Sequence, residues 1–237
     1  MPIHLRCEPS DVAPTVLLVG DPGRARAIAE KLDGARCYND HRGLLGFSGE
    51  YRGIEISVQT TGMGGPSAAI VVEELAMLGA KTLIRLGTCG GIGDGVGVVD
   101  LAIATASVPV EGTTPQYVDG APFAPVADHR VTRTLVDASG AVGRTTHTGL
   151  FMTHDVFYQQ GEDWERWRDR GVVAVEMEAS IIFTVALLRG MRAGAVCLVV
   201  DRVADRDTWA SDEQIAAGTE DLVRLGLEAG QALAKAP

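Results

Sequence analysis

Short apolar runs alternate along the whole chain with helix-like patterns, and this alternation constrains the fold more than any other feature. The run at 16–19 ends at Gly20 and is followed by a helical pattern over 24–32. A helical pattern likewise precedes the apolar run at 193–200. Strands that alternate with helices build sheets covered by helices, and no linker or internal repeat interrupts the pattern. We therefore predict one α/β domain over residues 1–237.

The same periodicities predict the remaining elements. Apolar runs predict further strands at 46–51, 54–60, 82–86, 101–108, 145–152 and 172–175, the first two joined as a hairpin at Arg52 and Gly53. Helical patterns run from Pro66 to Gly79, over 128–139, 163–170 and 179–189, and through the last stretch, which includes Leu233. Residues 109–127, rich in Pro, Thr and Asp, predict a loop long enough to be functional.

Charge and cysteine content narrow the class of protein. The chain has 21 Lys and Arg against 31 Asp and Glu, a net charge of −10, which argues against a nucleic-acid partner because phosphate backbones need clustered basic residues. Its four cysteines and five histidines show no metal-ligand spacing. No stretch reaches the roughly 18 apolar residues of a membrane helix, and the first ten residues do not resemble a signal peptide. We expect a cytoplasmic globular protein that binds no metal, membrane or nucleic acid.

Two arginines stand where a chain can bind a small anion. In the run GDPGR at 20–24, a strand turns into a helix through glycines, so that backbone N–H groups and the positive helix end face one point. Arg85 lies inside an otherwise apolar strand, where a guanidinium is costly unless it meets an anion, and Thr88 adds a donor nearby. The alternatives are an ordinary turn with a solvated Arg24 and a buried salt bridge of Arg85. Together the two arginines favour a phosphate site.

Three carboxylates stand at the edges of predicted elements. Glu176 and Glu178 flank Met177, and alternate strand residues share a face, so both acids are suited to accept sugar hydroxyls. The alternative is that they favour the positive end of the following helix. Asp201 ends a buried run, where desolvation raises the pKa of a carboxyl and lets it donate a proton. A helix cap or an ion pair with Arg202 is the structural alternative.

Five motifs, in order, resemble the nucleoside phosphorylase family of the trimer-of-dimers type. They are GDPGRARAIAEKL, NDHRGLLGFSGEYRG, TTGMGGPSAAIVVEEL, IRLGTCGG and VAVEMEAS. The resemblance runs from about His4 to the closing helix. It implies a nucleoside phosphorylase-like α/β fold, a single domain with a central mixed β-sheet flanked by helices. It also implies a pentosyltransferase that cleaves a nucleoside with inorganic phosphate as co-substrate and needs no cofactor.

The resemblance also implies a role for individual residues. Phosphate would be held by Gly20, Arg24, Arg85 and Thr88, with Arg42 reaching it from a neighbouring subunit. Ribose would contact Met177, Glu178 and the neighbouring subunit's counterpart of His4. The base would contact Cys89, Gly90, Phe157, Val175, Glu176 and Asp201, and Asp201 would protonate N7 of a purine. Sites shared in this way imply a homo-oligomer, by this resemblance a hexamer.

The sequence departs from the purine pattern near the acid. Purine enzymes of this family usually carry Ser-Asp there and an arginine further along, whereas Val200 precedes Asp201 and an ungapped count puts Gln214 at the arginine's place. Uridine phosphorylases usually lack the Asp and bind uracil with a Gln and an Arg of an inserted loop. The segment FYQQGEDWERW contains Gln159, Gln160 and Arg166, without the usual spacing. The Asp favours purine phosphorolysis, with uridine and then methylthioadenosine phosphorolysis as alternatives.

A nucleosidase and a nucleotide-binding module are the alternatives from two further classes of function. A nucleosidase would use water instead of phosphate and would not need Arg24, Arg42 and Arg85 together. A nucleotide-binding module without catalysis would tolerate the loss of Asp201 and Glu178. The presence of all five residues favours a phosphorylase over both.

Overall fold

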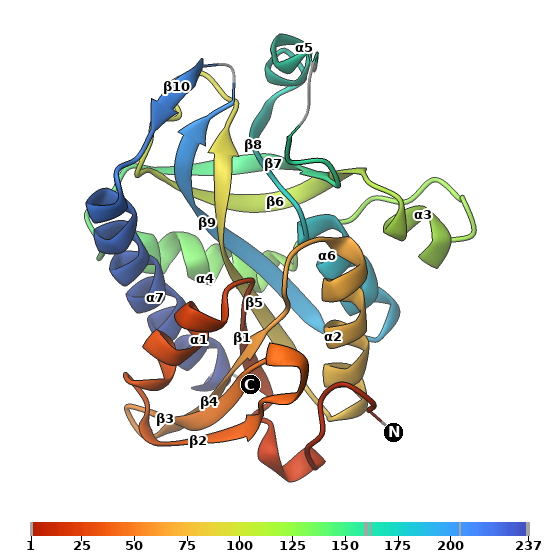
Figure 1. Cartoon of the computed structure of the whole chain (residues 1–237), viewed down its shortest axis with the longest axis vertical. Helices are drawn as coiled ribbons and strands as arrows, with labels where there is room; N and C mark the ends of the chain where they lie inside the picture. The colour runs from red at the N-terminus through yellow and green to blue at the C-terminus, as the bar shows by residue number, and fades with distance from the viewer. Residues whose placement is uncertain (1, 159–160, 162, 204, 236–237) are drawn as a thin grey trace.

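The computed structural model describes residues 2–158, 161, 163–203 and 205–235, with the backbone alone at 205–207. Ten strands in this part of the chain form one mixed sheet (Figure 1). The strands are β1 (Thr15–Val19), β2 (Asp33–Asn39), β3 (Gly46–Tyr51), β4 (Ile54–Thr60), β5 (Thr82–Gly91), β6 (Leu101–Val110), β7 (Thr146–His154), β8 (Val172–Glu176), β9 (Arg192–Arg202) and β10 (Asp205–Trp209). The helices are α1 (Pro22–Ala29), α2 (Gly65–Met77), α3 (Thr113–Tyr117), α4 (His129–Ser139), α5 (Trp164–Arg168), α6 (Ala179–Leu188) and α7 (Asp212–Lys235), with short 3-10 turns at Pro9–Asp11 and His41–Gly43.

Part of the sheet closes on itself around strand β5. The strand order is β10-β9-β6-β7-β8-β5-β1-β4-β3-β2, and β5 pairs with β9 as well. Strands β5, β9, β6, β7 and β8 therefore form a closed ring, and β1 to β4 extend from it as an open sheet. Beside the first half of β5 runs β1 in parallel, whereas β8 pairs antiparallel with Gly90 and Gly91 at its far end. Strands β1 and β8 therefore pair with different stretches of β5. The carboxyl end of β1 lies between these stretches, and ligands collect at such strand ends in α/β sheets.

Helices cover the sheet in two groups, each over its own apolar core. Helices α2 and α6 pack side by side on one face, and α1, α4 and α7 lie on the other (Figure 1). The first core holds Val72, Leu75 and Phe183, all fully buried. The second holds Ile28 and Leu225. Burial of this apolar surface is the main source of stability, and it fixes the strand ends that carry the polar residues.

The predicted fold class is confirmed, and several elements match the prediction closely. The hairpin at 46–51 and 54–60 is found with its predicted bounds. Other predictions were wrong: strand β2 was missed, β5 continues through the glycines to Gly91, and the predicted loop at 109–127 contains α3. Gln159 and Gln160 lie outside the described residues, whereas Arg166 lies on α5.

None of the described helices combines the length and the apolar character needed to cross a lipid bilayer.

Candidate active site

One cavity of about 850 Å³ lies beside the ends of β1, β5, β8 and β9. It is lined by every predicted site residue except His4 and Arg42. Those lining residues are Gly20, Arg24, Arg85, Thr88, Cys89, Gly90, Phe157, Val175, Glu176, Met177, Glu178 and Asp201. They are spread over most of the sequence, so the fold alone brings them together.

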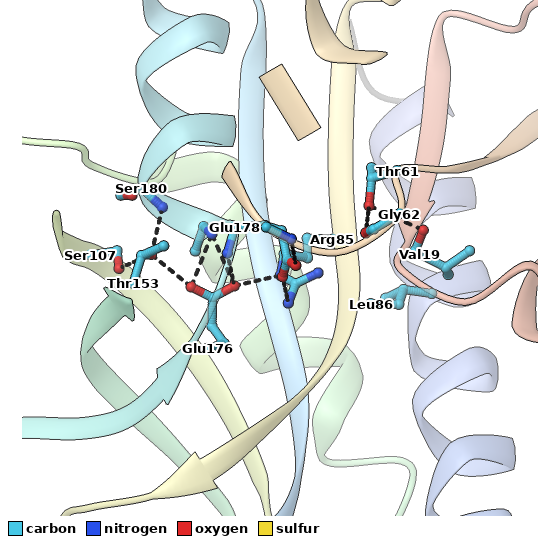
Figure 2. A network of polar contacts seen from close by, with 12 residues as sticks. Val19, Thr61, Gly62, Arg85, Leu86, Ser107, Thr153, Glu176, Glu178 and Ser180 are labelled. Carbon is cyan, nitrogen blue, oxygen red and sulfur yellow. Dashed lines mark hydrogen bonds and ion pairs between the residues drawn. The ribbon is translucent and has the colours of Figure 1, made fainter. Parts of the chain in front are cut away.

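At the centre of the site, Arg85 is buried between Glu176 and Glu178 (Figure 2). Its Nε donates to Glu176 Oε2 at 2.8 Å, its Nη2 pairs with Glu178, and its side chain is 4% exposed. Burial lowers the pKa of Arg85, but the two carboxylates more than offset this, so the pKa lies above its ordinary value. The buried salt bridge, one of the two alternatives for Arg85, is therefore present.

Glu176 is held by protein donors on both carboxylate oxygens. Oε1 accepts from Thr153 Oγ1 at 2.7 Å, and both oxygens accept from Ala179 N at 2.9 and 3.0 Å. Oε2 also accepts from Glu178 N at 2.9 Å. The carboxylate thus satisfies N–H groups at the start of α6, as the helix-dipole alternative for these acids proposed. Both carboxylate oxygens of Glu176, a residue predicted to contact the base, are thus engaged by groups of the protein.

Glu178 lies at the N-cap of α6, and its carboxylate is buried in the wall of the cavity. Its Oε1 accepts from Gly64 N at 2.6 Å, and its Oε2 pairs with Arg85. Burial raises the pKa of Glu178, and the opposing charge of Arg85 does not cancel the rise. Each oxygen keeps a lone pair that can accept a hydroxyl from a ligand.

Arg24 carries a charge that no described carboxylate neutralises by an ion pair. The N-cap residue Asp21 accepts from Gly23 N and Arg24 N, which starts α1 and directs Arg24 toward β5. The Nη1 of Arg24 donates to Leu86 O at 3.0 Å, while its Nε is buried without a hydrogen-bond partner. Burial, and then the nearby charge of Arg85, lower the pKa of Arg24. A buried guanidinium with an unused donor is suited to bind an anion.

Asp201, on β9, stands in apolar surroundings at the same cavity. A Cβ added at Gly90 would lie 3.2 Å from Asp201 Oδ1 and 2.5 Å from Val203 Cγ1, so Gly90 lets β5 approach both side chains closely. Burial raises the pKa of Asp201 to about 6. An acid with this pKa keeps a proton over part of the neutral range and can donate it.

His4 and Arg42 lie outside the cavity of their own chain. His4 Nδ1 is 2.7 Å from Glu74 Oε1, and Glu74 also accepts from the backbone N–H groups of residues 3–5. Arg42 is exposed, with a φ of 59° that is uncommon for a residue other than glycine. Within one chain these two side chains are not brought to the other predicted residues.

Several lining residues were not predicted from the sequence. Gly62 and Met63 precede α2, and the sequence predicted only the helix that follows them. Trp164 and Trp209 come from α5 and β10, and no motif pointed to them. No group of three or more His, Cys, Asp or Glu gathers in a metal-binding arrangement among the described residues.

Comparisons with known proteins identify the family. The family model described as the phosphorylase superfamily matches residues 14–235. The chain is 40% identical to a DeoD-type purine nucleoside phosphorylase of Geobacillus kaustophilus, over 97% of this chain and 98% of that protein. It is 37% identical to a protein of the same name from Caldanaerobacter subterraneus subsp. tengcongensis, over 96% and 99%. A uridine phosphorylase of Thermococcus kodakarensis is 39% identical, over 95% of this chain and 86% of that protein.

These matches cover nearly all of the chain, and they confirm the resemblance to nucleoside phosphorylases that the five motifs indicated. The chain belongs to the phosphorylase superfamily.

Proposed function

We propose that the protein is a purine nucleoside phosphorylase, a pentosyltransferase that uses inorganic phosphate as co-substrate and no cofactor. It would convert a purine ribonucleoside or deoxyribonucleoside to the free base and the pentose 1-phosphate. One observation carries the proposal: a single cavity holds a guanidinium without an ion-pair partner among the described residues, a buried carboxylate that can accept hydroxyls, and an acid whose pKa burial raises to about 6. The relatives named purine nucleoside phosphorylases support it.

Phosphate would bind between Arg24 and the carboxyl end of β1. Arg24 Nε has an unused proton, and its charge is repelled by Arg85. An anion seated beside Arg24 would relieve this repulsion and satisfy the buried donor. Arg85, Gly20 and Thr88 line the same cavity and would complete the phosphate site.

The pentose would lie against Glu178 and Met177, with the base toward Phe157, Val175, Cys89 and Gly90. The Glu178 carboxylate would accept sugar hydroxyls and hold the pentose still while the glycosidic bond lengthens. The bound phosphate would attack the anomeric carbon, and its negative charge would stabilise the positive sugar of the transition state.

Asp201 would act as general acid on the departing base. Its proton would pass to N7 of the purine as the C1′–N9 bond breaks, so that a neutral base leaves. The apolar surroundings of Asp201 support this role because they favour the protonated carboxyl.

The site would be shared between subunits of a homo-oligomer. His4 and Arg42 lie outside their own cavity, and Glu74 holds Nδ1 of His4, which leaves Nε2 to contact a nucleoside of the neighbouring subunit. We propose a hexamer in which Arg42 reaches the neighbour's phosphate. We further propose that residues 1–237 form one such domain, working in the cytoplasm in nucleoside salvage.

Uridine phosphorolysis is a second candidate, favoured by the 39% identity to a protein named uridine phosphorylase. Release of free base from inosine, adenosine, uridine and methylthioadenosine, each with and without phosphate, distinguishes the candidates. The proposal predicts phosphate-dependent cleavage of inosine or adenosine above that of uridine. Cleavage of uridine alone would replace it by the second candidate, and equal rates without phosphate would make the enzyme a hydrolase.

A further inference from the structure

Trp209 stands directly beside the proposed acid. In the antiparallel ladder of β9 and β10, Trp209 is the partner of Asp201, and Ala210 N donates to Val200 O at 2.8 Å. Residues directly opposite in such a ladder place their side chains on the same face, with Cβ atoms about 5 Å apart. Both side chains line the cavity. The ladder therefore places the indole on the same face as the Asp201 carboxyl.

Two further neighbours of Asp201 in the described part of the chain, Val203 and Val175, are also apolar. A Cβ added at Gly90 would lie 2.5 Å from Val203 Cγ1, 3.2 Å from Asp201 Oδ1 and 3.3 Å from Val175 Cγ1, so these atoms surround one point. Among the described residues, no hydrogen bond or ion pair of the Asp201 carboxyl is present. The side chains of Val203 and Val175 thus lie close to the Asp201 carboxyl, and Trp209 stands opposite Asp201 in the ladder.

The ionisable groups that line the cavity are mostly engaged away from Asp201. Glu176 and Glu178 pair with Arg85, Arg24 donates to Leu86 O, and Asp21 caps α1. His154 Nδ1 accepts from Val156 N at 2.9 Å. Arg202 follows Asp201 on β9 without an ion pair in the described part of the chain.

The thiol of Cys89, on β5, is a titratable group whose pKa the charge of Asp201 affects. Burial and the neighbouring Cys197 thiol raise the pKa of Cys89, and the Asp201 carboxylate contributes to the rise. A neutral thiol adds no positive charge that would hold Asp201 ionised. The side chains at 205–207 lie outside the described residues.

Gln214, which stands where an arginine was expected, is used to begin helix α7. Ser211 N donates to Gln214 Oε1 at 2.9 Å, and Gln214 N donates to Ser211 Oγ at 3.2 Å. This reciprocal pair is a capping arrangement, and Gln214 does not line the cavity. The residue at this place therefore cannot assist the acid as a base or a cation.

We infer that Trp209 is a positioning residue for the acid: its indole shields the Asp201 carboxyl from water and thereby helps Asp201 to keep its proton. The inference deepens the proposed purine phosphorolysis and rests on it. A carboxyl packed against an indole in apolar surroundings holds its proton to higher pH, and burial is the cause that raises the pKa of Asp201 to about 6.

The test compares Trp209→Ala and Trp209→Phe with the unaltered enzyme over a range of pH. Above the pKa of the acid, each unit by which that pKa falls lowers kcat/KM for inosine about tenfold. Trp209→Ala is expected to show this loss, with the alkaline limb of the profile moved to lower pH, and Trp209→Phe to regain most of it. Trp164→Ala, which alters another tryptophan of the cavity wall, is the matched control and is expected to leave the limb in place.

A second substrate separates proton donation from binding and folding. The base of 7-methylinosine is already a cation and leaves as a neutral molecule without a proton at N7. Trp209→Ala is expected to cleave 7-methylinosine within about twofold of the unaltered enzyme, because this reaction bypasses the acid. Equal losses on inosine and 7-methylinosine, or an unmoved limb, would overturn the inference.

A direct titration keeps this inference distinct from the proposed function. The pKa of Asp201, followed by carboxyl carbon NMR, is expected to fall in Trp209→Ala and not in Trp164→Ala. An unchanged pKa would overturn the role of Trp209 even if inosine is cleaved with phosphate. Absence of phosphate-dependent inosine cleavage by the unaltered enzyme would instead overturn the proposed function.

Discussion

Arg85 Nε donates to Glu176 Oε2 at 2.8 Å, and both side chains are almost fully buried. The pair joins β5 to the end of β8 beneath the cavity, and Glu176 also binds the first N–H groups of α6 (Figure 2). Strand β5 and helix α6, whose N-cap is Glu178, are therefore tied through one carboxylate. Several properties of the site depend on this link.

Replacement of Glu176 by Gln should destabilise the protein and weaken the site together. The Arg85 charge would keep only Glu178 as partner, and an amide nitrogen would face N–H donors. We expect the free energy of unfolding to fall by about 2 kcal/mol, as when a buried pair loses one member. Urea denaturation measures the change.

Glu228→Gln is the matched control for this substitution. Glu228 pairs with Arg52 at 2.8 Å, but the pair is open to solvent, and such pairs contribute less than about 1 kcal/mol. Equal effects of the two substitutions would contradict the structural role assigned to Glu176.

Replacement of Arg24 by Met should weaken phosphate binding without harming the fold. The change removes a buried charge that has no ion-pair partner among the described residues, so stability without phosphate should be equal or higher. A lost charged hydrogen bond corresponds to about a 10- to 100-fold rise in the KM for phosphate.

Stabilisation by added phosphate, read as a rise in Tm, should likewise need about 10- to 100-fold more phosphate in Arg24→Met. Arg26→Met alters an exposed arginine of the same helix and should keep both properties. An unchanged phosphate dependence of Tm in Arg24→Met would place the anion elsewhere.

The raised pKa of Asp201 has opposite consequences for activity and for stability. Its folded-state pKa, about 6, lies above the ordinary 3.8, so the folded state binds this proton more tightly. The contribution of Asp201 to stability is therefore favourable at low pH and is lost as the pH rises from about 4 to 6. Asp201→Asn should be more stable than the unaltered protein at pH 8, with little difference at pH 4.

The same substitution should remove most inosine turnover while it leaves the KM for phosphate unchanged, because only the proton donor is lost. Thermal unfolding at the two pH values and steady-state kinetics test the two halves separately. Undiminished inosine cleavage by Asp201→Asn would remove Asp201 from the chemistry.

Sites shared between subunits should allow two inactive variants to restore each other. One variant carries His4→Ala and Arg42→Ala, and the other carries Asp201→Asn. In a mixed dimer, the first variant's cavity would receive the intact His4 and Arg42 of the second. Random reassembly of equal amounts should then regain about a quarter of the full activity, whereas sites built within one chain would regain none.

The sequence predicted the fold wherever a side-chain pattern reflects burial. The hairpin at 46–51 and 54–60 alternates and turns at Arg52 and Gly53, so both strands were found with their observed bounds. Strand β2 was missed because its first five residues are all exposed, which leaves no apolar periodicity. Closure of the sheet through the pairing of β5 with β9 is a long-range event that no local pattern encodes.

The site, like the fold, was predicted from local patterns, and the parts that depend on long-range strand pairing were not. Arg85 and Glu176 were each recognised as costly to bury, yet the sequence could not tell whether Arg85 faces phosphate or a carboxylate, because that depends on how β8 meets β5. Trp209 gave no signal, since its place opposite Asp201 depends on an irregular register between β9 and β10.

Phosphorus NMR of the unaltered enzyme with inosine and inorganic phosphate tests the central claim most directly. Phosphorolysis predicts that the phosphate signal decreases while a ribose 1-phosphate signal grows. One molecule of ribose 1-phosphate should form for each molecule of hypoxanthine released. Release of hypoxanthine with an unchanged phosphate signal would show that water, and not phosphate, attacks the sugar, and it would contradict the account.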